Sequence, residues 1–258
     1  MFRYLLFPVL FLIASFTQVY AQKGSGDKYT KSKYKSYKND STATELYHNT
    51  APEVVKPSRD FLMLALTYNR WLVKPDSVKT KSFNYGFNGN ICYDFPIKKS
   101  NFSFATGLGI NVSATYLDQE QIKLNDTSAV LGAQARFVPD TAHFSRYKFV
   151  TAYLQAPFEL RYFANMKNRN KGFKAALGLQ IGTLLGAHTK GVTSISGTNV
   201  KEKMDTKRYV SPWNFAATMR IGWGNFSLFT SYNLTPVFKE NSGPPITPAS
   251  IGFCVTGL

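Results

Sequence analysis

Five ionisable residues fall on the polar faces of segments that otherwise alternate apolar and small polar residues. They are Asp94, Glu159, Arg161, Lys174 and Arg220. Acids and bases of this kind form ion pairs, and a charge left without a partner in a narrow protein interior is costly. We therefore expect these side chains to meet inside the fold as a mutually satisfied ionic plug. An ion path through them is the alternative.

Catalytic chemistry has two weak candidates, each centred on a histidine. His188 precedes Ser194 and Ser196, and His143 follows Asp140. A hydrolase or acyltransferase needs such a base to activate a hydroxyl group. Neither group forms a recognisable nucleophile motif, so we name no catalytic residue and expect no enzyme activity.

The cysteines do not form a metal-binding pattern. The sequence has two cysteines, Cys92 and Cys254, and no closely spaced histidines, so neither a metal nor a cofactor is expected. Both cysteines are predicted to point inward on strands that are separated by one other strand. Their spacing of about 9 to 10 Å exceeds disulfide reach, so we expect two buried free thiols.

The elements that position these residues are predicted β-strands. In the segment 83–95, Phe, Tyr and Ile side chains alternate with Asn, Gly, Cys and Asp, which gives one apolar and one polar face. Similar alternation predicts eight strands, at residues 62–68, 83–95, 102–114, 154–162, 173–185, 215–223, 226–234 and 249–255. The mean hydropathy of −0.20 and the lack of a long apolar run exclude a bundle of transmembrane helices.

The apolar faces of these eight segments contain no Lys, Arg, Asp, Glu or His. A soluble barrel needs charged residues on its outer face, whereas a Lys or Arg facing the bilayer midplane costs about 2 to 4 kcal/mol. The pattern predicts an all-β fold in which residues 60–258 form an eight-stranded antiparallel up-and-down transmembrane β-barrel. A soluble sandwich or barrel is the alternative.

The connections between the predicted strands alternate in length. Those at 96–101, 164–171 and 224–225 are short, and those at 117–145 and 188–211 are long. Because short turns face the periplasm in such barrels, we expect a cell outer membrane location with both termini periplasmic. The aromatic residues predicted to form the two interfacial girdles are Trp71, Tyr93, Phe95, Tyr116, Tyr162, Trp213, Trp223 and Phe226.

The N-terminal part of the chain is predicted to lie outside the barrel. Residues 1–21 have the positive, apolar and small-residue regions of a signal peptide. Residues 22–59 are rich in Lys and Tyr without apolar periodicity, which predicts a disordered basic periplasmic tail. Five of its lysines are predicted to contact a polyanion, the cell wall or a periplasmic partner, with no role for nucleic acid: Lys28, Lys31, Lys33, Lys35 and Lys38.

The segment 153–162, YLQAPFELRY, resembles the "YLEIPLLLKY" strand of the PorT-like small outer-membrane β-barrels of Bacteroidetes. Gln155 and Glu159 depart from that pattern, but the Gly-rich segment 176–182 is similar to the next strand of the family. The resemblance implies an eight-stranded outer-membrane barrel, and some relatives are associated with type IX secretion. The match is carried by Tyr153, Leu154, Pro157, Leu160 and Tyr162.

These observations together predict a non-enzymatic outer-membrane barrel that serves as a structural or assembly component. The alternatives are a PorT-like accessory of type IX protein secretion, which would bind secretion-machinery subunits, and an enzyme that modifies lipid A or phospholipid. The expected partners are outer-membrane lipid and lipopolysaccharide. The segment 188–211 has a surplus of basic residues that could contact lipopolysaccharide phosphates, and an ordinary solvated loop is the alternative that we favour. These residues are Lys190, Lys201, Lys203, Lys207 and Arg208.

Overall fold

The structure, a computed structural model, describes residues 61–97, 100–125, 134–165, 172–195 and 198–257. The predicted signal peptide and the basic tail, with Lys28, Lys31, Lys33, Lys35 and Lys38, lie outside the described residues.

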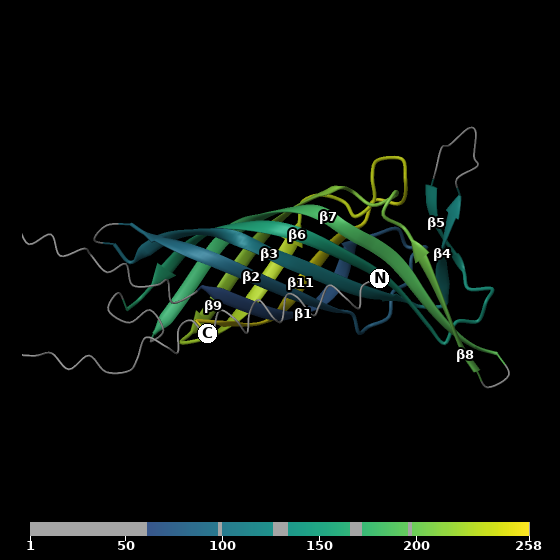
Figure 1. The fold of residues 1–258 in the computed structure, drawn as a ribbon, viewed down its shortest axis with the longest axis horizontal. Helices are drawn as coiled ribbons and strands as arrows, with labels where there is room; N and C mark the ends of the chain where they lie inside the picture. The colour runs from purple at the N-terminus through teal and green to yellow at the C-terminus, as the bar shows by residue number, and fades with distance from the viewer. Residues whose placement is uncertain (1–60, 98–99, 126–133, 166–171, 196–197, 258) are drawn as a thin grey trace, which may run out of the picture. The chain divides into compact units, whose positions relative to one another are not determined.

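Eight antiparallel strands close into a barrel (Figure 1). They follow the order β6-β3-β2-β1-β11-β10-β9-β7, and the pairing of β6 with β7 closes the ring. Each barrel strand therefore pairs with the next barrel strand along the chain, which confirms the predicted all-β, up-and-down fold. The barrel strands are β1 (Leu62–Val73), β2 (Tyr85–Pro96), β3 (Phe102–Leu117), β6 (Arg146–Phe163), β7 (Phe173–Ile195), β9 (Trp213–Trp223), β10 (Phe226–Asn233) and β11 (Thr247–Thr256).

Three further strands lie outside the ring. β8 (Thr198–Asp205) pairs with the last part of β7, and β4 (Glu120–Asn125) pairs with β5 (Gln134–Pro139) in a separate hairpin. Among the residues that the structure describes, we find no helix of the length and apolarity that a membrane crossing requires.

The two ends of the barrel differ in their connections. At one end, here called the short-turn end, β2 joins β3, β6 joins β7 and β9 joins β10; Met63 near the start of β1 pairs there with Thr256 of β11. The opposite end, here called the loop end, carries the β4–β5 hairpin and β8 (Figure 1). Both ends of the barrel sequence thus lie at the short-turn end.

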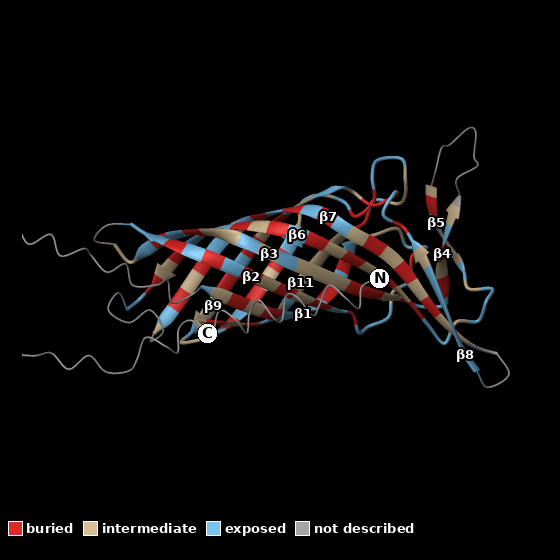
Figure 2. Cartoon of the chain, viewed as in Figure 1, coloured by how far each residue is buried: buried red, intermediate tan, exposed pale blue. Residues whose placement is uncertain are grey.

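Buried and exposed residues alternate along the strands (Figure 2). The side chains that point outward are large and apolar, for example Leu108, Leu177 and Phe253, which are 63%, 65% and 77% exposed. A soluble monomer seldom exposes an apolar surface that continues around the whole molecule. This outward surface, here called the apolar belt, has the composition expected of a surface that contacts hydrocarbon.

Several predicted strand boundaries were wrong, two of them by eight residues or more, and the long connections contain strands that the sequence did not predict. β6 begins at Arg146 rather than at residue 154, and β7 continues to Ile195 rather than ending at residue 185. The register between β6 and β7 shifts where Ala152 and Tyr153 pair with Gly186 and Leu184. Because this bulge changes the phase of the alternation, the pattern expected of a lipid-facing strand ends there although the strand continues.

Trp71 was wrongly assigned to an interfacial girdle. It is 4% exposed, because it lies on the same inward face of β1 as the buried Asn69. Residues two apart in a strand lie on the same face of the sheet, so Trp71 points inward as Asn69 does. Five of the other predicted girdle residues are exposed on the outside, namely Tyr93, Phe95, Trp213, Trp223 and Phe226, whereas Tyr116 and Tyr162 are partly buried there.

Candidate functional site

The interior of the barrel is the candidate site, and its layer nearest the short-turn end is ionic. Arg161 Nη1 lies 3.1 Å from Asp94 Oδ1, and Arg161 Nε lies 2.8 Å from Glu159 Oε2. The same carboxylate oxygen of Glu159 lies 3.1 Å from Arg220 Nη2. Each of these four residues is at least nine-tenths buried. The structure thus brings four of the five predicted charged residues into one network.

Lys174, the fifth residue, is also buried at the short-turn end. Its ammonium group donates a hydrogen bond to the hydroxyl of Thr256, the last residue of β11. Asp94 accepts a further hydrogen bond of 3.2 Å from the hydroxyl of Ser103.

Small residues on the neighbouring strands provide space for these long side chains. Glu159 pairs with Ala105 on β3 and Gly178 on β7, and Arg220 pairs with Ala176. A Cβ atom on Gly178 would lie 2.9 Å from Cγ of Glu159. Two acids and two arginines balance in charge within this network, which offsets much of the cost of burying them.

A thin layer of sulfur and aromatic groups lies against the ionic network. Cys92, Cys254, Met63, Ala65 and Phe229 form one buried cluster. Cys92 Sγ lies 3.7 Å from Met63 Sδ, and a guanidinium nitrogen of Arg161 contacts the same sulfur at 2.9 Å. Both cysteines are buried and neither is in a disulfide, which confirms the prediction of two inward thiols.

Side-chain amides form the next layer toward the loop end. Gln155 Nε2 donates hydrogen bonds of 2.9 Å to Asn88 and 2.8 Å to Asn90. Asn90 in turn donates to Asn88 at 2.6 Å, and Asn88 donates to Gln180 at 3.5 Å. The layer connects β2, β6 and β7 directly across the lumen.

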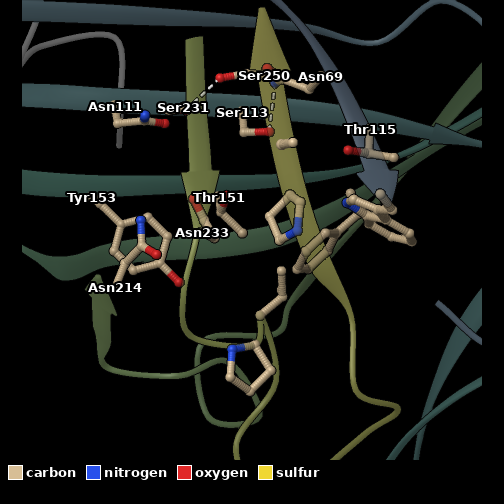
Figure 3. Close-up of a pocket in the computed structure, with 16 residues that line it drawn as sticks. Asn69, Asn111, Ser113, Thr115, Thr151, Tyr153, Asn214, Ser231, Asn233 and Ser250 are labelled. Atoms are coloured by element: carbon tan, nitrogen blue, oxygen red, sulfur yellow. Dashed lines mark hydrogen bonds between the residues drawn. The ribbon is translucent and has the colours of Figure 1, made fainter. Parts of the chain in front are cut away.

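A small polar chamber lies beyond the amides (Figure 3). Asn69 Nδ2 donates to Ser113 Oγ at 2.8 Å, and the hydroxyls of Ser231 and Ser250 lie 2.6 Å apart. The cavity has a volume of about 50 Å³. Since one water needs about 10 to 15 Å³ by this measure, the chamber has room for about three to five waters, far less than a solute requires.

An apolar cluster covers the chamber at the loop end, here called the outer cap. Phe149 stacks on Phe238 with ring centroids 5.7 Å apart, and Trp71 packs edge-on against Phe149 at 6.4 Å. Phe137 of β5 packs against both Trp71 and Phe238, at 6.0 Å each. Sequence reasoning missed this cap. The available signal was that Trp71 and Phe149 occupy inward-facing positions in their strands. The loop residues that pack against them, such as Phe238, are distant in sequence.

The two histidine candidates lie in different elements at the loop end. His188 lies on the outer face of β7, paired with Val150 and with Asp205 of β8. Ser196 lies outside the described residues. Asp140 accepts hydrogen bonds from the backbone N–H groups of Ala142 and Phe144, so it stabilises the turn that contains His143. Among the described residues, no three His, Cys, Asp or Glu side chains are grouped closely enough to hold a metal ion.

The resemblance segment forms the second half of β6, and its residues occupy structural positions. Tyr153 and Pro157 point inward, and the hydroxyl of Tyr153 donates to the Ser211 carbonyl at 3.2 Å. Leu154 and Leu160 are exposed in the apolar belt. Tyr162 packs beside Phe102 with ring centroids 5.3 Å apart.

A comparison with protein families identifies the barrel. A family model described as "Outer membrane protein beta-barrel domain" matches residues 56–239. The chain belongs to this family. The barrel is therefore an outer-membrane protein, and lipid surrounds its apolar belt. No curated protein and no solved structure matches the chain.

Proposed function

We propose that this outer-membrane barrel is a non-conducting, non-enzymatic component that serves the structure or assembly of the membrane. The observation that supports the proposal is the filled lumen, which has the ionic network at the short-turn end and the outer cap at the loop end. An eight-stranded barrel has an interior just wide enough for side chains to fill. Successive layers here leave a chamber for only a few waters, which makes the barrel a poor pore.

In this proposal the short-turn end and both termini lie in the periplasm, and the loop end lies outside the cell. The lengths of the connections support this orientation, because barrels of this class have short periplasmic turns and longer external loops. The signal peptide predicted at residues 1–21 would direct export.

A PorT-like role in type IX secretion is the second candidate. Its support is the resemblance of the segment 153–162, whose residues in β6 pack in the lumen or face lipid. Partner contacts would then be made elsewhere, and the basic tail is the predicted contact site. A pull-down of periplasmic proteins with and without residues 22–59 tests this role: retained secretion subunits that depend on the tail would favour it over a purely structural one.

The lipid-modifying alternative depends on His188 as a base. Asp205 is its strand partner, and the candidate hydroxyl of Ser196 lies outside the described residues. Incubation with labelled lipid A tests this alternative, and the non-enzymatic proposal predicts no product with either the wild type or His188→Ala.

Conductance in planar bilayers tests the closed lumen. We expect no steady current from the wild type. A cap variant, Trp71→Ala with Phe238→Ala, should also remain closed, because the amide and ionic layers persist. Adding Gln155→Ala, Glu159→Ala and Arg161→Ala should produce steady current, because the amide and ionic layers are then interrupted as well. A matched control replaces the lipid-facing Trp213 and Phe215 by Ala and should stay closed; steady current from the wild type would refute the proposal.

A further inference from the structure

A row of lysines crosses three adjacent strands on the outside of the barrel. Lys148 on β6 pairs directly with Lys190 on β7, and Lys190 pairs directly with Lys203 on β8. Like charges that face each other across strands destabilise a sheet. An anion bound from outside would offset the repulsion between these side chains.

The residues around this row are also mainly basic. Arg146 and Lys201 both pair with Val192, one outward position farther from the belt. On the side nearer the belt, His188 pairs with Asp205. Five cations and one carboxylate thus share this outward face, here called the basic row; Glu202 pairs with Gly191 on the opposite face of the same hairpin.

Two tyrosines hold one end of the basic row at the edge of the apolar belt. Lys148 Nζ donates to the hydroxyl of Tyr85 at 3.3 Å, and it lies 5.8 and 5.7 Å from the ring centroids of Tyr85 and Tyr116. The two hydroxyls lie 3.4 Å apart. Aromatic residues with a polar tip are typical of the level at which lipid headgroups lie.

The electrostatics of His188 agree with a positive local potential. Burial lowers the pKa of this imidazole, and Lys203, Lys148 and Lys190 lower it further, whereas Asp205 opposes the shift. His188 lies beyond Leu185, on the part of β7 above the apolar belt. Added positive charge is disfavoured there, as expected beside a row of cations.

An apolar groove begins at the same tyrosine. Its lining includes Leu66, Tyr68, Phe83, Tyr85 and Phe87, which come from β1, β2 and the residues before β2. Tyr85 thus lies both in the groove and in contact with Lys148. The groove faces outward, and its apolar lining suits a hydrocarbon chain.

A second group of cations lies beside this groove. Arg70, Lys79 and Lys81 line a hollow with Tyr68, which also lines the groove, and with the carboxylate Asp118. The groove therefore has basic residues near it at two places, through Tyr85 and through Tyr68.

We propose that this surface binds a phosphorylated glycolipid of the outer leaflet, the lipid A part of lipopolysaccharide. Its phosphates contact the basic row, and one acyl chain lies in the groove. A phosphate monoester carries a charge of about −1.5 to −2 near neutral pH and accepts several charge-assisted hydrogen bonds, which suits a row of lysines. The inference rests on the proposed orientation, in which the loop end faces outward.

Binding of diphosphoryl lipid A to the full barrel in phosphatidylcholine nanodiscs tests the site. The test variant is Lys148→Gln with Lys190→Gln and Lys203→Gln. The control has the same loss of charge at exposed positions away from the row, Lys123→Gln with Arg136→Gln and Lys239→Gln. We expect the test variant to bind at least tenfold more weakly, and the control to bind within about twofold of the wild type. The wild type should bind dephosphorylated lipid A as weakly as the test variant binds lipid A.

Three outcomes would overturn the proposal: equal binding by the test variant, equal binding of dephosphorylated lipid A, or equally effective competition by phosphatidylglycerol, a phospholipid without the glycolipid phosphates. Resistance of each folded variant to unfolding in SDS at room temperature shows that it is intact.

Labelling of Lys203→Cys by a membrane-impermeant maleimide on whole cells tests the orientation separately. Labelling only after cell disruption would overturn both the orientation and the outer-leaflet ligand, whereas the conductance test of the closed lumen does not depend on either result.

Discussion

Glu159 and Arg161 form a 2.8 Å ion pair inside the barrel, and both side chains are almost fully buried. They are two residues apart on β6, so the period of the strand points both into the lumen. The same oxygen of Glu159 also contacts Arg220 of β9. One carboxylate therefore links two strands that are not neighbours in the sheet and balances two arginines.

The substitution Glu159→Gln should strongly destabilise the barrel. Removing this charge leaves Arg161 and Arg220 buried without their shared carboxylate, which costs about 3 to 5 kcal/mol in typical buried networks. Urea unfolding in lipid vesicles measures the difference in free energy. The control Glu202→Gln, at an exposed position of β8, should change it by less than about 0.5 kcal/mol. Equal stability of the two variants would contradict this account of the network.

Gly107 should not tolerate a side chain, whereas Gly186 should. A Cβ atom on Gly107 would lie 1.9 Å from the Ile91 carbonyl oxygen and 2.7 Å from Cα of Cys92, so β2 and β3 would have to separate. A Cβ atom on Gly186 meets nothing within 4 Å. Gly107→Ala should destabilise the barrel by about 1 to 3 kcal/mol, as overpacking does. The same unfolding assay measures both variants, and a stable Gly107→Ala barrel would show that the strands are not in such close contact.

Cys92 and Cys254 should react with maleimide only after the barrel unfolds. Each is 1% exposed, and a thiol reacts through its accessible thiolate form. Mass spectrometry should detect no label on the native protein. After unfolding without a reductant it should detect two labels, because neither cysteine is in a disulfide. Rapid labelling of the folded protein, or fewer than two labels after unfolding, would be inconsistent with this lumen.

His188 should titrate below its ordinary pKa of about 6.5, because burial and then Lys203 lower its pKa. Lys203→Gln should raise it. The unfolded chain binds a proton more readily, so this residue's contribution to stability is greatest above pH 6.5 and falls as the pH decreases through that value. NMR chemical shifts of the imidazole measure the pKa in both proteins. Titration of the wild type at or above 6.5 would argue against the local positive potential.

The sequence predicted the barrel well because alternation is a local property. Phe83 and Phe95 already mark a segment with one apolar face, and lipid exposure makes that face uniform over the whole strand. The inward direction of Glu159 and Arg161 followed from the same period. Their distances to Asp94 and Arg220 depend on the register of neighbouring strands, which alternation does not fix.

The regions that were missed lie at the loop end. Beyond the bulge at Leu185, the outward residues of β7 are His188 and Lys190, so the strand no longer matches a lipid-facing pattern. The outer cap joins Trp71 to Phe238, which are distant along the chain. Such contacts depend on how the loops fold over the barrel, and no sequence period indicates them.

Collision measurements with nitroxide spin labels test the membrane barrel most directly. Labels replace Leu108 and Leu177 on the apolar belt and, as a contrast, the exposed Lys123 on β4 in the hairpin at the loop end. In lipid vesicles, we expect the two belt labels to collide readily with oxygen, which dissolves in hydrocarbon, and rarely with a water-soluble nickel complex. The label at Lys123 should show the reverse. Frequent nickel collisions at Leu108 and Leu177 would mean that water covers the apolar belt, which contradicts the account.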